Sequence, residues 1–284
     1  MTGELRFTKM VASGNDFIVI DNRAAKRSAW SDSLPGVAKR LCERRLSVGA
    51  DGVLVIEDSK RADFRMRIFN PDGSEVDMCG NGSRCAALYA VENNIVSKDM
   101  NLALARKGWL KIETGAGIID AEVTGLKVKI RLTDPKAVKL NRKITIGKKV
   151  YKVHSINTGV PHAVVFLDNI DKVDVEALGS KLRFHKAFKP KGTNVDFVKI
   201  VNLKEIKVRT YERGVEAETY ACGTGASASA IIANLIFGLR PHIDVITRSG
   251  EVLRVYFNVV KNKVKDIYLE GEANVVCKGG MTYV

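Results

Sequence analysis

The chain has 284 residues, a length typical of one large domain or of two domains of about 140 residues each. Hydrophobic residues make up 45% of it and charged residues 27%, values close to the globular average, which excludes a disordered or fibrous chain. No apolar run approaches the roughly 18 residues that a membrane span needs. The first ten residues, with Glu4, Arg6 and Lys9, lack the apolar core of a secretory signal. We therefore expect a cytoplasmic protein with no membrane partner.

The net charge of +14 raises the question of a nucleic-acid partner. Lysine and arginine are spread along the chain with acidic residues among many of them, and no zinc-finger spacing or long basic run is present. The sequence therefore favours a protein that binds no nucleic acid. A basic surface could also help to attract an anionic substrate. A nucleic-acid-binding protein remains the non-enzymatic alternative, and it predicts salt-sensitive binding to duplex DNA.

Five cysteines are present, an odd number, in a chain without a recognisable signal peptide. They are Cys42, Cys79, Cys85, Cys222 and Cys277. This usage favours a reducing compartment and free thiols. No Cys-x-x-Cys pair occurs, and the four histidines show no ligand spacing, so we expect no bound metal.

Most of the predicted elements are strands, and many alternate polar and apolar residues as half-buried antiparallel strands do. In chain order, the first half is predicted to form strands over Leu5–Ala12 and Phe17–Asn22, a helix over Gly36–Leu46, strands over Gly52–Glu57 and Asp63–Asn70, a helix over Ser83–Val91, and strands over Trp109–Glu113, Ile118–Val123 and Leu126–Leu132. The second half is predicted to form strands over Val150–Asn157 and Ala163–Leu167, a helix over Asp171–Phe184, strands over Val195–Val201 and Ile206–Glu212, a helix over Ala226–Phe237, and strands over His242–Thr247, Val252–Val259 and Val264–Glu270.

Three segments of the first half recur in the second half in the same order. Gly49–Val55 resembles Gly192–Val198, which lies 143 residues later, and Cys79-Gly80-Asn81-Gly82 resembles Cys222-Gly223-Thr224-Gly225 at the same offset. Gly14–Val19 resembles Gly159–Val164 at an offset of 145. A period this long is no solenoid repeat and indicates two homologous halves.

The predicted fold class is therefore α+β, with two pseudo-symmetric halves that each wrap a mostly antiparallel sheet around one central helix. The helix over 226–237 is small or apolar nearly all round, which predicts that protein encloses it. We expect the N-terminal half to cover residues 1–124 together with a C-terminal strand over 275–284, and the C-terminal half to cover residues 125–274.

Each repeated cysteine motif opens one of the two central helices. Glycines there allow a tight turn and a close approach of ligand to the backbone amides. The free N–H groups of a helix start bind anions, and the helix dipole contributes about 0.3–1 kcal/mol at a surface. Positive charge at this position predicts a lowered thiol pKa and a better thiolate for Cys79 and Cys222. Cys42, Cys85 and Cys277 fit buried structural positions instead.

Pseudo-twofold halves would place the two helix starts opposite each other. A substrate carboxylate could then accept amide hydrogen bonds, with one sulfur on each face of its α-carbon. That arrangement suits removal of a proton from one face and its return to the other, the two thiols acting as base and acid. His162 and Glu212 could tune the thiols. A structural turn histidine and a simple Glu212–Arg213 pair are equally compatible with the sequence.

The residues around both cysteines closely resemble the diaminopimelate epimerase family. The segment from Phe69 to Cys85 resembles that family's first signature, and the segment from Tyr211 to Gly225 resembles its second. Gly14-Asn15-Asp16-Phe17 also matches, and the resemblance covers essentially the whole chain. Related cofactor-independent racemases such as proline racemase carry His after the Cys-Gly of the first motif, where this chain has Asn81.

The resemblance implies an isomerase that interconverts LL- and meso-diaminopimelate without a cofactor, in the pathway to lysine and cell-wall peptide. It also implies α/β halves whose sheets wrap central helices, and a homodimer. The acid and base residues implied by the motif match are Cys79 and Cys222. The groups that resemble supports of their ionisation are His162, expected with Cys79, and Glu212, expected with Cys222.

The resemblance also implies a set of residues that hold the substrate. The side chains in this set are Asn15, Asn70, Asn194, Glu212 and Arg213, and the amide donors for the carboxylate at the reacting centre are Gly80, Asn81, Gly223 and Thr224. The planar fork of an arginine suits a second, distant carboxylate.

Two positions depart from the family pattern, since Val160 replaces a common Asn and Gly52 a common Gln. Both changes remove a polar side chain from the expected substrate site, so we carry neither contact over. The enzymatic alternative is a racemase or isomerase of the same fold acting on another amino acid. A cysteine hydrolase using Cys222 with His162 is a further alternative, which predicts a covalent acyl-enzyme.

Overall fold

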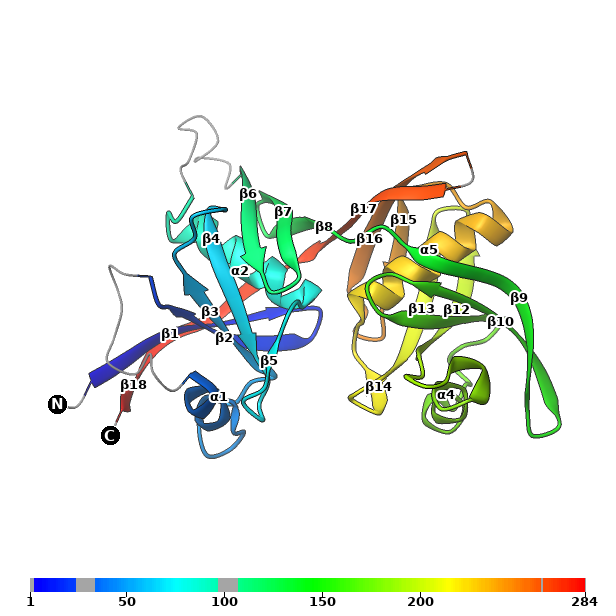
Figure 1. Cartoon of the computed structure of the whole chain (residues 1–284), viewed down its shortest axis with the longest axis horizontal. Coiled ribbons are helices and arrows are strands. Elements are labelled where there is room, and N and C mark those ends of the chain that lie inside the picture. The colour runs from blue at the N-terminus through cyan, green and yellow to red at the C-terminus, as the bar shows by residue number, and fades with distance from the viewer. Residues whose placement is uncertain (1–2, 24–33, 97–106, 262, 284) are drawn as a thin grey trace. The chain divides into compact units, whose positions relative to one another are not determined.

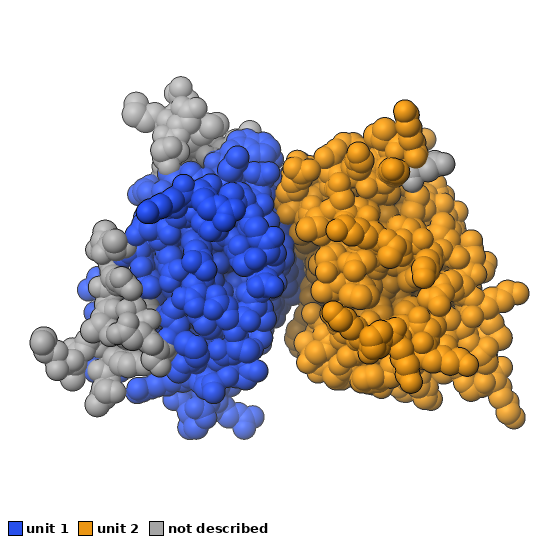
Figure 2. Space-filling model, in the orientation of Figure 1, with its two compact units in different colours: residues 1–130, 271–284 blue, residues 131–270 orange. Residues whose placement is uncertain are grey.

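The computed structural model describes residues 3–23, 34–96, 107–261 and 263–283. The chain divides into two compact units, one formed by residues 1–130 and 271–284 and the other by residues 131–270 (Figure 2). The chain passes between them inside two strands, β8 (Lys127–Arg131) and β17 (Lys263–Glu272). The sequence-based division placed the boundaries at 124/125 and 274/275. Thr124-Gly125 proves to be the turn between two paired strands, with Gly125 at φ 64°.

Unit 1 is a curved mixed sheet with one helix inside it and one outside (Figure 1). Its elements are β1 (Gly3–Ala12), β2 (Asn15–Asp21), α1 (Leu34–Cys42), β3 (Gly52–Glu57), β4 (Phe64–Phe69), β5 (Glu75–Val76), α2 (Gly80–Glu92), β6 (Lys107–Thr114), β7 (Gly117–Thr124), most of β8 and β18 (Asn274–Tyr283). Strands β2 and β3 are parallel, as are β4 and β6. Strand β1 pairs antiparallel with β18 and β2, β4 with β3 and β5, and β7 with β6 and β8.

Unit 2 repeats this arrangement of strands and helices, with one additional short helix. Its elements are β9 (Lys136–Ile146), β10 (Lys149–Asn157), β11 (Pro161–Phe166), α4 (Val175–Arg183), the short 3₁₀ helix η3 (Lys186–Phe188), β12 (Asn194–Asn202), β13 (Glu205–Glu212), β14 (Ala217–Thr219), α5 (Gly223–Phe237), β15 (Ile243–Ile246), β16 (Val252–Val260) and most of β17. The parallel pairs are β11 with β12 and β13 with β15, the counterparts of the parallel pairs in unit 1. The predicted α+β fold with two pseudo-symmetric halves is confirmed.

The central helices occupy equivalent places in the two units. Helix α2 contacts β1, β2, β3, β4, β6 and β7, and α5 contacts their counterparts β10, β11, β12, β13, β15 and β16. Residues 81–91 of α2 and 225–233 of α5 are buried. A helix surrounded by one curved sheet needs mostly small or apolar side chains on all its faces, which both sequences supply, with Arg84 of α2 as an exception. This packing fixes where each helix begins.

The outer helices cover the other face of each sheet. Leu34, Val37 and Leu41 of α1 pack on strand residues such as Ile18 and Val53. In unit 2, α4 covers the equivalent strands in the same way. Each sheet is therefore covered on both faces, which explains why its central strands read as nearly continuous apolar runs.

Three expectations differ from the structure. Helix α1 ends at Cys42, and Leu46, expected at the end of the helix, is exposed in a turn. Strand β9 was not predicted, because it is a lysine-rich, largely exposed strand without a clear apolar alternation. Cys277, expected to be buried, is exposed on β18, while Cys42 and Cys85 are buried as expected. None of the helices in the described residues is long and apolar enough to cross a membrane.

Candidate active site

Cys79 lies at the N-cap of α2. Its backbone is extended, with φ −140° and ψ 121°, and the Gly82 N–H donates to its Sγ at 3.5 Å. Its carbonyl accepts from the Ser83 N–H at 2.8 Å, so the helix begins directly after the cysteine. Gly82 has little room for a side chain, because a Cβ there would lie 3.0 Å from Leu54 Cδ2. The Cys79 thiol therefore sits at the helix start, as the sequence predicts.

Asn15 faces the sulfur of Cys79 from β2. The Asn15 side-chain NH₂ donates to Asp51 Oδ2 at 2.9 Å, which turns its carbonyl oxygen to within 3.9 Å of Cys79 Sγ. A carboxylate accepts hydrogen bonds only, so this contact defines the orientation of the amide. Asp51 is in turn paired with Arg44, at 2.8 Å. The predicted substrate residue Asn15 is thus held in place beside one of the two predicted acid/base residues.

Asp16 reinforces this support from the next position of β2. It pairs with Arg44 at 2.7 Å and with Lys9 at 3.1 Å. Burial acts to raise the pKa of Asp16, but the hydrogen bonds from Arg44 and Lys9 outweigh burial and lower it. Asp16 therefore remains an anion, and its ion pairs hold the side chains of Arg44 and Lys9 in place.

Asn81 is held by a buried arginine that the sequence analysis did not identify. Arg84 is fully buried in α2 and donates to Asn81 Oδ1 at 2.7 Å, to Ser13 Oγ at 2.6 Å and to the Glu272 carbonyl at 3.1 Å. The signal was present in the sequence, because a lone arginine in an otherwise small and apolar helix needs buried partners. The side-chain oxygen of Asn81 is therefore held within the protein, whereas the contact expected with the substrate carboxylate uses the backbone amide of Asn81.

Asn70, a further expected substrate residue, lies in the turn after β4. Its side chain donates to Ser74 Oγ at 3.0 Å, and its N–H donates to the Ser74 carbonyl at 2.8 Å. Its role at the substrate stays a prediction.

Cys222 holds the equivalent N-cap of α5. Its backbone is again extended, with φ −123° and ψ 111°, and its carbonyl accepts from the Ala226 N–H at 2.8 Å. Its Sγ lies 3.4 Å from Thr224 Oγ1. A cavity of about 10 Å³, the space of about one water molecule, borders the residue. Both predicted acid/base cysteines thus precede the first residue of a central helix.

The pKa of Cys222 moves in the direction opposite to the one expected from the helix dipole. Burial, followed by the negative charges of Glu212 and Asp196, raises the pKa of the thiol well above its usual value. Thr224 and the Gly225 amide act in the other direction but do not outweigh burial. Cys222 is therefore a protonated thiol at neutral pH in this structure.

Glu212 lies at the end of β13 and is one of the charges that act on Cys222. Burial, the largest influence, raises the pKa of Glu212; Thr219 and His162 act to lower it, and Asp196 acts to raise it. The acidic group expected beside Cys222 is thus electrostatically coupled both to that thiol and to the nearby histidine.

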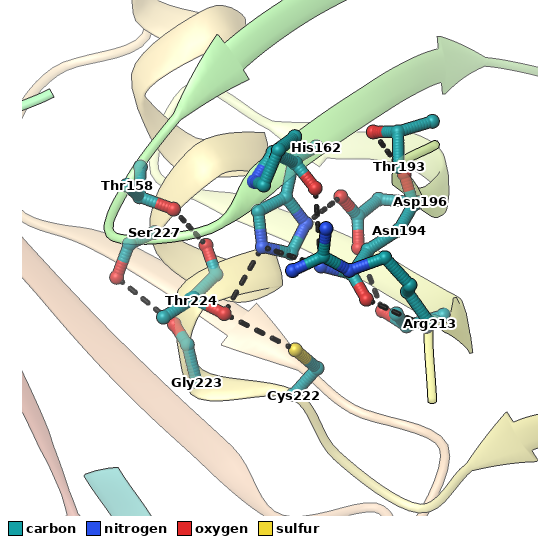
Figure 3. A network of polar contacts seen from close by, with 12 residues as sticks. Thr158, His162, Thr193, Asn194, Asp196, Arg213, Cys222, Gly223, Thr224 and Ser227 are labelled. Carbon is teal, nitrogen blue, oxygen red and sulfur yellow. Dashed lines mark hydrogen bonds and ion pairs between the residues drawn. The ribbon is translucent and has the colours of Figure 1, made fainter. Parts of the chain in front are cut away.

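A chain of polar contacts joins His162 to the start of α5 (Figure 3). His162 Nδ1 lies 2.8 Å from Asp196 Oδ2, and His162 Nε2 lies 3.0 Å from Thr224 Oγ1. The Thr158 hydroxyl donates to the Thr224 carbonyl at 3.0 Å. Asp196 was not anticipated, although a charge inside the apolar strand Asn194–Val198 was a usable signal. His162 is therefore connected to Cys222 through the hydroxyl of Thr224.

Asn194 lies opposite His162 in the parallel pairing of β11 with β12. Its Oδ1 accepts from the Arg213 N–H at 2.7 Å, and its Nδ2 donates to the Pro161 carbonyl at 3.0 Å. Asn194 thereby fixes the backbone of Arg213, whose side chain is the expected partner of a distant carboxylate. Unit 2 brings together His162, Asn194, Glu212, Arg213, Cys222, Gly223 and Thr224.

The predicted pairing of His162 with Cys79 joins residues of different units and stays a prediction. Of the two positions that depart from the family pattern, Gly52 has little space, since a Cβ there would lie 3.0 Å from the Phe69 carbonyl oxygen. Within the described part of the chain, no three His, Cys, Asp or Glu side chains are grouped so as to hold a metal ion.

The chain is similar to one family over most of its length. The family model described as diaminopimelate epimerase matches residues 7–136 and 154–276. The chain is 44% identical over 289 aligned positions to a diaminopimelate epimerase of Aquifex aeolicus (strain VF5), with 98% of each chain covered. It is 41% identical to one of Methanocella arvoryzae, with 97% of this chain and 96% of that protein covered.

Solved structures with low sequence identity share the fold. A PhzF-family phenazine biosynthesis protein of Bacillus anthracis has a TM-score of 0.73 at 18% identity, covering 98% of this chain and 99% of that one. A hydroxyproline epimerase from Agrobacterium vitis has a TM-score of 0.67 at 15% identity, covering 98% and 92%. The arrangement of two similar units is therefore shared with proteins whose sequences have diverged far.

Proposed function

Because this chain belongs to the diaminopimelate epimerase family, we propose that it interconverts LL- and meso-diaminopimelate, a step toward lysine and cell-wall peptide. One observation carries the proposal. Cys79 and Cys222 are the N-caps of α2 and α5, the two helices that occupy equivalent places in the two units. A pair of equivalent thiols at helix starts suits a reaction whose two directions are chemically alike.

The proposed mechanism uses the two thiols as base and acid. The thiolate of one cysteine takes the proton from the α-carbon, so that the C–H bond breaks and its electron pair remains on carbon. The thiol of the other cysteine then delivers a proton to the opposite face of that carbon and becomes the thiolate. The enzyme is left with the two protonation states exchanged, ready for the reverse direction. The raised pKa of Cys222 supports its role as the donor in the present state.

The amides at the helix starts would stabilise the substrate carboxylate as negative charge develops on it. Gly80 and Asn81 begin α2, and Gly223 and Thr224 begin α5, where the first N–H groups have no acceptor within the helix. Fixed donors of this kind contribute most to catalysis when they are already in place before the reaction. We assign these four residues to the reacting end of the substrate.

The remaining expected substrate residues are assigned to the rest of the molecule. Asn15, Asn70 and Asn194 would bind its polar groups, with Glu212 near the amino group and the Arg213 guanidinium on the distant carboxylate. The hydrogen bonds that hold Asn15 and the backbone of Arg213 support these roles. We further propose that the protein works without metal or organic cofactor, as a homodimer in the cytoplasm.

The test is the reaction of LL-diaminopimelate in D₂O with the purified protein. Loss of optical purity together with one deuterium at the α-carbon is expected, because the delivered proton comes from a thiol that exchanges with solvent. The Cys79→Ala and Cys222→Ala variants should each lose epimerisation while remaining folded. Cys277→Ala is the matched control, because Cys277 is exposed on β18, and it should retain full activity.

Full turnover in either Cys79→Ala or Cys222→Ala would overturn the two-thiol mechanism. Absence of turnover with LL-diaminopimelate, combined with racemisation of proline or another amino acid, would overturn the substrate assignment alone. A covalent acyl-enzyme detected by mass spectrometry would overturn the reaction class.

A further inference from the structure

His162 and Asp196 form a contact that solvent does not reach. Both side chains have an exposed fraction of 0%, and His162 Nδ1 lies 2.8 Å from Asp196 Oδ2. The two residues lie 34 positions apart in the chain, on the adjacent parallel strands β11 and β12. A carboxylate in such a place needs donors for its oxygens, since an unsatisfied buried charge is costly.

Asp196 obtains both donors from neighbouring elements. Its Oδ1 accepts from Thr210 Oγ1 at 2.8 Å, and Thr210 lies directly opposite Asp196 in the antiparallel pairing of β12 with β13. Its Oδ2 faces His162 Nδ1. Because a carboxylate can only accept, the nitrogen that faces it must carry the proton. His162 is therefore protonated on Nδ1.

Asn194 gives an independent indication of the state of the other ring nitrogen. Its Oδ1 accepts from the Arg213 N–H, a group that can only donate, so its NH₂ is the group directed toward His162 Nε2, at 3.5 Å. An NH₂ in this position is compatible with an unprotonated Nε2. Nε2 is then free to accept from the Thr224 hydroxyl, whose oxygen in turn lies 3.4 Å from Cys222 Sγ.

The start of α5 is packed against this pair without space to spare. A Cβ at Gly225 would collide with Asp196 Oδ1 and would lie 3.3 Å from His162 Cε1. The helix that carries Cys222 therefore rests directly on the His162–Asp196 pair, and neither side chain can turn away into solvent. The titratable groups around this relay come from three elements. Asp196 on β12 contacts His162, Glu212 on β13 interacts electrostatically with His162, and Cys222 at the start of α5 contacts Thr224.

We propose that Asp196 is a positioning residue, which holds His162 with its proton on Nδ1 and with Nε2 directed through the Thr224 hydroxyl to Cys222. Each proton released in this relay is taken up by the next group. The Cys222 S–H gives its proton to Thr224 Oγ, whose own proton passes to His162 Nε2. A thiolate and an imidazolium beside the Asp196 carboxylate result, and the reverse transfer restores the thiol. This proposal rests on the proposed function, and it links His162 to Cys222 in addition to any role at Cys79.

The test of the tautomer uses NMR of ¹⁵N-labelled histidine and needs no substrate. The chain has only four histidines, so the His162→Gln variant assigns the His162 signals. In the unmodified protein, Nδ1 should show the shift of a protonated ring nitrogen and Nε2 that of an unprotonated one. In Asp196→Asn, whose amide can donate to Nδ1, this assignment should be lost or reversed. Because no substrate is involved, the result stands even if the proposed substrate is wrong.

The kinetic test measures epimerisation by the same variant. Asp196→Asn should lower kcat on the order of 10²-fold or more and change KM little, because Asp196 acts through His162 and does not touch substrate. Asp244→Asn is the matched control. Asp244 lies on β15 and pairs with Arg254 of β16, so this variant should leave kcat unchanged. A His162 that keeps its Nδ1 proton in Asp196→Asn, or an unchanged kcat, would overturn the proposal.

If Asp196→Asn does not fold, variants of Thr224 test whether its hydroxyl links His162 to Cys222. Thr224→Val removes the hydroxyl at nearly constant volume, and kcat should fall by about tenfold or more. Thr224→Ser keeps the hydroxyl and should recover most of that loss. Full activity of Thr224→Val, or a loss that serine does not restore, would show that the hydroxyl carries no proton between His162 and Cys222.

Discussion

The guanidinium of Arg84 donates to Asn81 Oδ1 at 2.7 Å from a position that solvent does not reach. The same group also donates to Ser13 and to the carbonyl of Glu272, residues of two other segments of unit 1. One buried side chain thus connects the first turn of α2, the turn after β1 and the end of β17. We expect the position of the loop that carries Cys79 to depend on this connection.

Replacement of Arg84 by methionine should therefore destabilise the protein. Three acceptors would lose a buried donor, and the free energy of unfolding should fall by about 3–5 kcal/mol. Urea unfolding monitored by circular dichroism measures this change. The exposed Arg65→Met on β4 is the matched control and should change stability by less than about 0.5 kcal/mol. Equal stability of the two variants would show that Arg84 does not hold the loop.

Asp51 should control the activity through the orientation of Asn15. Asp51→Ala removes the acceptor of the Asn15 NH₂ group, so the amide can turn away from Cys79, and kcat/KM should fall on the order of tenfold. Arg44→Ala leaves the contact between Asn15 and Asp51 in place and should have a smaller effect. Steady-state kinetics of both variants distinguishes the two. A larger loss of kcat/KM in Arg44→Ala than in Asp51→Ala would show that the effect comes from the charge of this cluster. The orientation of the Asn15 amide would then be excluded as its cause.

Gly225→Ala tests the close packing of α5 on the His162–Asp196 pair. The new methyl group would collide with Asp196 Oδ1, and we expect a loss of about 1–3 kcal/mol in unfolding free energy together with reduced kcat. Gly108→Ala is a milder comparison, because its methyl group would meet only a Val91 side-chain methyl at 3.3 Å. If Gly225→Ala were as stable and active as Gly108→Ala, the side chains of His162 and Asp196 would have to be free to move away from α5.

Cys42 should make the stability of the protein fall in alkaline solution. Burial, followed by the charges of Asp16 and Asp51, raises the pKa of its thiol to about 11 from an unfolded value of 9.0. Between these two values the native state keeps a proton that the unfolded state has lost. The contribution of this thiol is therefore complete below pH 9 and disappears as the pH rises to 11, a loss of about 2–3 kcal/mol.

Urea unfolding at pH 8 to 11 measures this dependence. Cys42→Ala should lose stability less steeply with pH than the unmodified protein, whatever its stability at pH 8. Cys222 contributes in the same direction, since its pKa is also raised, so some slope should remain in the variant. Identical slopes in the two proteins would show that the Cys42 thiol has the same proton affinity when folded and unfolded.

The sequence by itself determined the features that depend on local pattern. The two cysteine motifs, with glycines next to each thiol and small or apolar residues after them, mark the starts of α2 and α5. The recurrence of three segments in the same order, at offsets of 143 to 145 residues, reveals the two halves. The family signatures identify the residue types of the site without any coordinates. Each of these conclusions rests on neighbours in the chain, whose geometry follows from backbone preference and periodicity.

Only the tertiary structure decided how the site is tuned. It brings Asp196 to His162 across 34 positions of sequence and leaves Cys277 exposed. It also reverses the direction expected for the pKa of Cys222, because burial and the carboxylates of Glu212 and Asp196 outweigh the helix start. Proton affinity depends on the charges and the solvent that surround a group in space. Those surroundings come from strands far apart in the chain, which no local pattern specifies.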